Sequence, residues 1–428
     1  MPLLDFLGRP VQPQKLHAEE AGPSLTGLRP VLGGHPARGL TPSRLASILL
    51  EAEEGDATRY FELAEEMEEK DLHYLGVLST RKRAVAQLEI TIEAPTDEAK
   101  DVAIADEIRE FLRRDTLQAE LFDVLDAIGK GISVSEIIWE TSASQWRPRR
   151  IKWCDPRWYR FDPADGTTVQ LQREPGAWGA LTPFKYIVHV AKAKSGLPVR
   201  GGLARAVAWI WLFKNFTLKD WVGFSEVFGQ PYRVGKYHPS ATSDDKAALL
   251  RAVASIGSDA AAIIPESMVI EFIEAAKTGS IDVYERISRY LDEQLSKGVL
   301  GQTTTTEVTT GGGSRALGEV HAGVKADIRD ADAAALAATL NRDLVQPYVD
   351  LNHGPQQRYP KLVIGWSDEL GLAQKLDYTA QFVAQGMRVE ASQVRDRLGW
   401  TEPGIDAEVL GNFTTRLNEL QEEEDRHG

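Results

Sequence analysis

Residues 201–228, GGLARAVAWIWLFKNFTLKDWVGFSEVF, are the most distinctive stretch of the chain, and the predicted architecture is arranged around them. Apolar residues recur in this stretch at helical spacing, which predicts one long amphipathic helix. The aromatic area is larger than one partner helix would bury, so two interpretations stay open, a buried core helix and a helix that contacts a neighbouring subunit. We favour subunit contact for Trp209, Trp211, Phe213, Phe216 and Trp221.

A small module separates this helix from a second one, predicted for residues 280–298. Within the module, residues 231–237 predict a strand and residues 243–255 a helix, and the runs AAIIP and MVIEFIEA predict a pair of strands. Ordinary enzymes more often join two such helices by a short turn. The order of helix, module and helix therefore indicates a specialised architecture.

A loop rich in threonine and glycine, GQTTTTEVTTGGGS at residues 301–314, follows the second helix. A loop of this length inside a compact chain is usually either functional or disordered. Residues 315–351 then predict a helix of unusual length, which Pro347 should kink near its end. Beyond it we expect a strand at residues 361–366, two short helices within 368–398 and a polar end.

The part of the chain before residue 201 mixes helices and strands. Residues 1–40 are rich in proline and glycine and predict an extended or disordered arm. Helices are predicted from Thr41 onward, residues 97–129 are again predicted to be helical, and a strand is predicted at residues 87–95. Short β-prone runs fill residues 132–190, so the fold class is α+β.

The composition indicates a globular protein of two or three regions, with 428 residues and a net charge of −14. No apolar run is long enough for a membrane helix, and the first residues lack the pattern of a signal peptide. No basic patch of convincing size predicts tight binding to nucleic acid. The single cysteine, Cys154, is expected to be a packed core residue.

Sequence patterns of common catalytic sites are missing. The nearest approach to a phosphate-binding loop, residues 129–133, lacks the first glycine and is better interpreted as a turn from a helix to a strand. The chain contains no GxGxxG, HExxH or GxSxG pattern, and its eight histidines are scattered. We therefore expect no enzymatic activity, no catalytic residue, no cofactor and no metal site.

The order of these segments resembles the portal proteins of Mu-like tailed bacteriophages. Each motif is weak alone, and their order and spacing across residues 41–350 make the resemblance specific. The carrying motifs are Asp71-Leu72-His73, Ser79 to Lys82, Gly131 to Glu136 with Trp139-Glu140, Pro156-Arg157 with Arg160-Phe161, Lys185 to His189, Gly201 to Arg205, Phe213-Lys214, Trp221, and Phe224 to Pro231.

The resemblance implies a ring of about twelve subunits at one capsid vertex, through which double-stranded DNA is packaged and ejected. It also implies a portal fold divided into named parts. These are a flexible N-terminal arm (1–40), a wing (41–200), a first stem helix (201–229), a clip (230–279), a second stem helix (280–299), a tunnel loop (300–314), a tunnel helix (315–351) and a C-terminal wing or crown with a tail (352–428).

The same resemblance implies partners and a location. The expected partners are the terminase large subunit during packaging, the major capsid protein, the scaffold and the head-completion or neck proteins, with no membrane. The protein would lie in the virion, and in the host cytoplasm during assembly. Candidate clip residues for docking are Tyr232, Arg233, Lys236, Tyr237 and His238. Candidate channel residues in the tunnel loop are Gln302, Thr303, Thr304, Thr305, Thr306, Glu307, Thr309 and Thr310.

Charge is compatible with such a channel. About twelve copies at −14 each would carry about −168 formal charges, and an acidic bore repels phosphates, so that DNA slides through it. Small neutral hydroxyls in residues 301–314 would touch a passing duplex without strong ion pairs, and Gly311 to Gly313 would let the loop change shape. Two alternatives stay open: another ring-forming head–tail adaptor, or a nucleic-acid enzyme with an unrecognised site.

Overall fold

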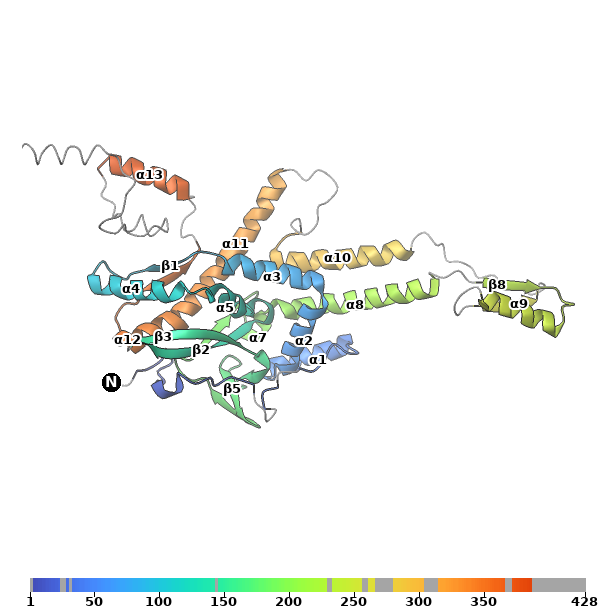
Figure 1. The fold of residues 1–428 in the computed structure, drawn as a ribbon, viewed down its shortest axis with the longest axis horizontal. Coiled ribbons are helices and arrows are strands. Elements are labelled where there is room, and N and C mark those ends of the chain that lie inside the picture. Colours follow the sequence, from blue (N-terminus) through green and yellow to red (C-terminus); the bar gives the residue numbers. More distant parts are fainter. Residues whose placement is uncertain are drawn as a thin grey trace, which may run out of the picture. The chain divides into compact units, whose positions relative to one another are not determined.

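A computed structural model describes residues 3–23, 28–30, 33–142, 145–228, 233–255, 261–265, 280–303, 315–365 and 372–386. The chain divides into two compact units, Met1–Gly365 and Trp366–Gly428. Within the described part of the second unit lies one helix, α13 (Leu372–Ala384), in the region where short helices are predicted. Helices and strands are mixed in the first unit (Figure 1), so the predicted α+β class is confirmed.

Three helices begin the folded body, close to their predicted bounds: α1 (Pro42–Glu53), α2 (Thr58–Lys70) and α3 (Leu72–Ala86). The side chain of Thr41 caps α1 by accepting a hydrogen bond from the Arg44 amide at 3.3 Å. Asp71 caps α3 by accepting bonds from the amides of His73 and Tyr74, each at 3.0 Å. The capping residues therefore fix where α1 and α3 begin, whereas α2 begins after Ala57 without a side-chain cap.

Residues 97–129 are helical, as predicted, and the helical region is interrupted twice. The structure contains three helices there, α4 (Ala99–Leu112), α5 (Leu117–Val124) and α6 (Ala127–Lys130). Neither break is at a proline or glycine. At the first break, the Arg114 guanidinium donates to the carbonyl oxygen of Pro148 at 2.9 Å and also bonds Glu120. Tertiary contacts thus override a local sequence that is compatible with one helix.

Three small antiparallel sheets complete the body. The central one has the order β3-β2-β7, a second has the order β4-β5-β6, and β1 pairs with β10 far along the chain. Strands in the 132–190 region are confirmed, and β6 is an additional one. The strands are β1 (Ile90–Glu93), β2 (Ile132–Ser142), β3 (Gln145–Cys154), β4 (Tyr159–Phe161), β5 (Val169–Glu174), β6 (Ala177–Ala180), β7 (Tyr186–Val190) and β10 (Lys361–Ile364).

The described part of the N-terminal arm is extended and packed on the central sheet, so flexibility does not describe residues 3–23. Leu16 is fully buried, and its carbonyl oxygen accepts bonds from the Trp139 amide at 3.3 Å and the Lys185 ammonium at 3.1 Å. Buried Glu136 accepts bonds from the amides of Glu20 and Ala21 and pairs with Lys185 at 3.0 Å. These backbone bonds give the arm a fixed path that its composition does not reveal.

The helix–module–helix order is present as predicted. After the short α7 (Pro198–Gly201), helix α8 spans Leu203–Phe228 and α10 spans Ser280–Leu300. The module between them contains β8 (Arg233–Tyr237), α9 (Ser243–Ser255) and β9 (Ala261–Pro265), and β8 and β9 pair in parallel. The predicted strand in MVIEFIEA lies outside the described residues. Figure 1 shows α8 and α10 side by side.

The predicted long helix is present from residue 315 to residue 353, with one irregular turn. Helix α11 (Arg315–Leu340) continues through a π-helical turn (Asn341–Val345) into α12 (Gln346–His353). The wide turn directly precedes Pro347, which has no amide hydrogen and cannot make the regular helical bond. Side chains of the turn bind two strands, because Asp343 accepts from the Val188 amide at 2.9 Å and Asn341 accepts from the Leu362 amide at 2.7 Å.

Two glycines allow the start of α8 to approach the central sheet closely. Gly131, between α6 and β2, has a backbone φ of +92°, which residues other than glycine rarely adopt. A Cβ on Gly202 would lie 2.4 Å from the backbone nitrogen of Gly131 and 2.4 Å from the backbone carbon of Lys130. The backbones at Gly131 and Gly202 are therefore in contact just before α8 begins. A Cβ added to Gly202 would meet backbone atoms, not a flexible side chain that could move aside.

We predict that Gly202→Ala destabilises the protein by about 3 kcal/mol, because the added methyl overlaps backbone atoms. Gly76→Ala is the matched control: Gly76 is in the exposed middle of α3 with no atom within 4 Å of its Cβ position, so the change should be neutral or stabilise by up to about 1 kcal/mol. Thermal unfolding followed by circular dichroism at one protein concentration measures both. Equal midpoints for the two variants would contradict the close contact.

Candidate functional site

Helices α8 and α10 run antiparallel beside each other. Their register is fixed by the ion pair between Lys214 and Asp292, at 2.6 Å, and by the ring contact of Phe224 with Tyr284, whose centroids are 5.9 Å apart. The residue numbers of each pair add up to nearly the same total, so residue 216 lies level with residue 290. A fixed register means that exposed side chains on the pair form a defined surface.

A buried ion-pair group holds both helices on α3. The Lys214 ammonium lies 2.9 Å from both carboxylate oxygens of Asp71, the capping residue of α3, and pairs with Asp292 on α10. His73 and Ser296 add a side-chain hydrogen bond of 2.8 Å between α3 and α10. Buried charges need partners of opposite sign, so this group specifies where the helix pair sits.

A second group joins the end of α10, where segment 304–314 begins, to the middle of α11. The Arg81 guanidinium of α3 binds both carboxylate oxygens of Asp332 on α11, at 2.7 and 3.0 Å. It also donates to the carbonyl oxygen of Val299 on α10 at 2.8 Å. Gly301, with a φ of +71°, lies so close to α11 that a Cβ would contact Val324 and Ile328 within 3 Å. The segment thus starts where α10 is joined to α3 and to the middle of α11.

Two of the predicted channel residues are described. Gln302 is buried and Thr303 is half-buried, so Gln302 belongs to the anchor of the loop rather than to an open surface. The others lie outside the described residues: Thr304, Thr305, Thr306, Glu307, Thr309 and Thr310.

The aromatic residues predicted for subunit contact fall into three groups. Trp211 is 4% exposed and packs in the core, Trp209 and Trp221 are half-buried, and Phe213 and Phe216 are 48% and 38% exposed. The sequence reasoning missed further exposed apolar residues, which are Leu218 and Val222 on α8 and Val283 and Tyr290 on α10. Their spacing of three or four residues was the available signal. Ile287 on α10 is also exposed, at 40%.

The predicted docking residues gather on β8 and the turn after it. Tyr232 lies outside the described residues, and of Arg233 only the strand backbone is described. Lys236 and His238 are exposed, and His238 shares a hydrogen bond of 2.7 Å with Ser240. Tyr237 is half-buried, and the Lys246 ammonium of α9 lies 4.8 Å from its ring centre. The described residues of this set therefore offer polar and aromatic groups to a partner.

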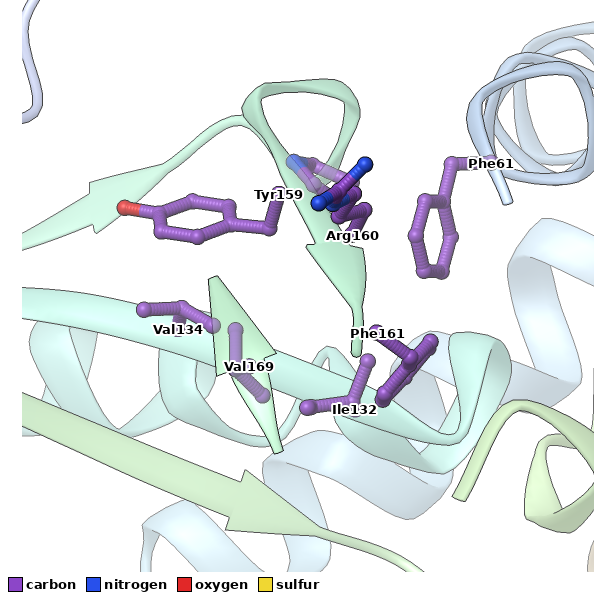
Figure 2. Close-up of a pocket in the computed structure, with 8 residues that line it drawn as sticks. Phe61, Ile132, Val134, Tyr159, Arg160, Phe161 and Val169 are labelled. Carbon is purple, nitrogen blue, oxygen red and sulfur yellow. The ribbon is translucent and has the colours of Figure 1, made fainter. Parts of the chain in front are cut away.

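Two cavities adjoin the described elements. One, with a volume of about 10 Å³, is enclosed by the rings of Phe61, Tyr159 and Phe161 and by aliphatic side chains of β2 and β5 (Figure 2). It has room for about one water molecule and is a packing defect rather than a substrate site. The other is a groove of about 630 Å³ between the chain at residues 35–40 and α8, with Trp211 and Leu212 in its wall.

The described titratable groups give no nucleophile or phosphate site. Burial raises the pKa of the Cys154 thiol to about 12, so the thiol is unreactive at neutral pH. Burial and the Arg342 charge lower the pKa of His189 to about 4, and its neutral ring shares a hydrogen bond with Thr339. Lys130, the lysine of the loop-like 129–133 motif, is buried and paired with Asp126 at 2.6 Å, consistent with the predicted turn.

The described residues also lack a membrane-spanning helix and a metal-binding group. No helix among them is long and apolar enough to cross a membrane. In the same ranges, histidine, cysteine and carboxylate side chains form no group of three or more that could hold a metal ion.

Comparisons with known proteins agree over most of the chain. The family described as the portal protein of Mu bacteriophage matches residues 61–400. A Mu-like prophage protein, gp29 of Haemophilus influenzae, is 35% identical over 92% of this chain and 77% of its own length. The portal protein of Escherichia phage Mu is 36% identical over 88% of this chain and 74% of its own length.

Solved structures with lower similarity include a chain from the virion of a native gene transfer agent particle, with a TM-score of 0.43, 14% identity and coverage of 86% of this chain and 96% of that one. Another is an HK97-family phage portal protein from Corynebacterium diphtheriae, with a TM-score of 0.40, 11% identity and coverage of 78% and 96%.

The family match and the two curated relatives place the protein in the class of phage portal proteins. Within that class, the chain belongs to the family of Mu bacteriophage portal proteins. The resemblance seen in the sequence and the portal function inferred from it are thereby confirmed. Its relatives are structural portal proteins.

We predict that Lys214→Met destabilises the protein by about 3–5 kcal/mol, because it leaves the buried Asp71 carboxylate without its cation. Lys192→Met is the matched control, since Lys192 is exposed and has no ion pair among the described residues, and it should change stability by less than about 0.5 kcal/mol. Denaturant unfolding of both variants checks this. If Lys214→Met unfolds like its control, the ion-pair group does not hold the helices.

Proposed function

We propose that copies of this chain close into a ring of about twelve subunits at one capsid vertex, through which double-stranded DNA enters and leaves the head. The observation that carries this proposal is the match of residues 61–400 to the Mu portal family. The exposed apolar residues on α8 and α10 support it, because a single copy leaves Phe213, Val222 and Tyr290 in water.

The parts of the chain take distinct roles in this proposal. Residues 41–200 form the wing and residues 352–428 the C-terminal wing or crown, while α8 and α10 are the stem helices at 201–229 and 280–299. The module at 230–279 is the clip, and 315–351 is the tunnel helix. Support comes from the two helices that bracket the module and from the ion pairs that fix them to α3.

The clip is the proposed docking place for other proteins of the particle. The terminase large subunit would bind there during packaging, and head-completion or neck proteins afterwards, while the wing would meet the scaffold and the major capsid protein. Exposed Lys236 and His238 with the Tyr237 ring supply charge, hydrogen bonding and aromatic area, which are the contributions that protein interfaces use. With these partners, the proposed location of the chain is the virion, after assembly in the host cytoplasm.

The segment 300–314 is proposed to be the tunnel loop. Its threonines are small and neutral, so they would contact a passing duplex without strong ion pairs, and the net charge of −14 per copy would keep phosphates from sticking. Anchoring of its first end, through the Arg81 bond to the Val299 carbonyl oxygen and the packing of Gly301 on α11, supports this role because it would hold the start of the loop at one height in every subunit.

The proposed function predicts that purified copies of the chain assemble into a ring. Negative-stain imaging and native mass spectrometry of the purified full chain should show a toroid with a central hole and about twelve copies. A stable monomer would contradict the ring. A ring of smaller height, in particles that contain no DNA, would favour a head–tail adaptor. Metal-dependent loss of a nucleic-acid substrate in the same sample would favour the enzyme alternative.

Shortening residues 303–313 is predicted to reduce the DNA retained in particles without preventing ring formation, because in this proposal the loop contacts DNA whereas the subunit contacts lie on α8 and α10. Replacing the threonines of 303–306 by serine is the matched control, since it keeps every hydroxyl. Packaged DNA per particle is the measurement. Normal genome retention in the shortened variant would remove the tunnel-loop role.

A further inference from the structure

The exposed residues of α8 lie on different sides of that helix. Residues turn by about 100° per position, so Phe213 and Asp220, seven positions apart, share one side. Val222 lies about 160° away from Asp220, on the opposite side, and Leu218 is near it. A helix with two exposed sides suits head-to-tail contact, in which every subunit meets its neighbours through two different surfaces.

The groove beside α8 has a cationic rim, and the α8 residues that line it are centred about 120° around the helix from Phe213 and Asp220. Its wall includes Trp211, Leu212 and Asn215, and its rim carries Arg38 and Lys219. Both rim side chains are exposed, and neither forms an ion pair with any residue that the structure describes. Lys70 also reaches the groove, but it is paired with Glu66 at 2.6 Å. The groove thus combines an apolar wall with two cationic side chains that form no ion pair with a carboxylate of the described residues.

The side of α8 that carries Phe213 has the complementary character. Phe213 is an exposed aromatic ring, and Asp220 is an exposed carboxylate with no ion pair in the described part of the chain. Residues 211–219 of the groove and residues 213–220 of this side lie at the same height along α8. Copies related by rotation around a ring axis meet at equal heights, so the two surfaces can face each other in adjacent subunits.

From this complementarity we propose that the groove at Arg38 and Lys219 is an interface with a second copy, whose Phe213 enters the groove while its Asp220 pairs with Arg38 or Lys219. This inference rests on the proposed ring and names the surfaces that close it. The groove of about 630 Å³ is large enough for an aromatic side chain, and a buried ring contributes strongly to association. The ion pair would set the height of one subunit against the next.

A charge exchange within one chain tests the pairing. Asp220→Lys and Arg38→Glu should each weaken assembly on the order of tenfold, since like charges then meet across the interface. The double variant Asp220→Lys/Arg38→Glu keeps the net charge and should recover most of the assembly. The matched control is Asp220→Lys/Lys192→Glu, which has the same net charge, and because Lys192 lies outside the groove it should stay as weak as Asp220→Lys.

Disulfide formation gives a second measurement. Phe213→Cys/Asn215→Cys places one thiol on each side of α8, so oxidation should link copies into a ladder of multimers, whereas each single variant should stay unlinked. Native Cys154 is buried and contributes no background. Recovery by the charge exchange together with a ladder supports the proposal. Toroids of normal yield in every charge variant, or linked dimers from Phe213→Cys alone, overturn it while the ring stands. No toroid from the unmodified chain overturns the proposed function itself.

Discussion

Lys214 lies between the carboxylates of Asp71 and Asp292, and this buried ion-pair group is the constraint on which the placement of the long helices depends. It ties α8 and α10 to α3, and Arg81 on the same helix ties the end of α10 to the middle of α11. One helix near the start of the chain therefore positions three helices that follow much later. The module 230–279 lies between α8 and α10, and the segment 304–314 lies between α10 and α11. All three helices are held on α3, so either insertion can vary without disturbing the body.

Local signals in the sequence predicted much of the fold, because several of its helices carry clear apolar periodicity and a few begin at residues whose side chains cap the helix. Thr41 and Asp71 are such caps, and the lone proline at residue 347 marked the irregular turn. The sequence did not show where the helical region 97–129 is interrupted, since Arg114 at the first break bonds the carbonyl oxygen of Pro148, which is distant in the sequence. Pairing of β1 with β10 and the packing of the arm on Glu136 likewise depend on contacts between distant residues, which periodicity cannot show.

The candidate contact surface was predictable in kind rather than in detail. The sequence indicated that α8 has more aromatic side chains than one partner buries. It could not indicate that Trp211 would be taken by the core while Phe213, two residues later, stays in water. That division depends on which side of α8 meets the body, and the body is assembled from segments before residue 200 and after residue 280. The groove was invisible for the same reason, because Arg38 and Lys219 come from distant parts of the chain.

The distribution of charge reconciles an acidic chain with contact between identical copies. A net charge of −14 would make copies repel one another if the carboxylates lay at their contact surfaces. Helix α8 carries three cations, Arg205, Lys214 and Lys219, against two carboxylates, Asp220 and Glu226. Helix α10 carries three cations against four carboxylates, so the pair is close to neutral although the chain is strongly acidic. Excess negative charge must therefore lie on other surfaces, where it opposes phosphate binding without opposing the association of α8 with its neighbour.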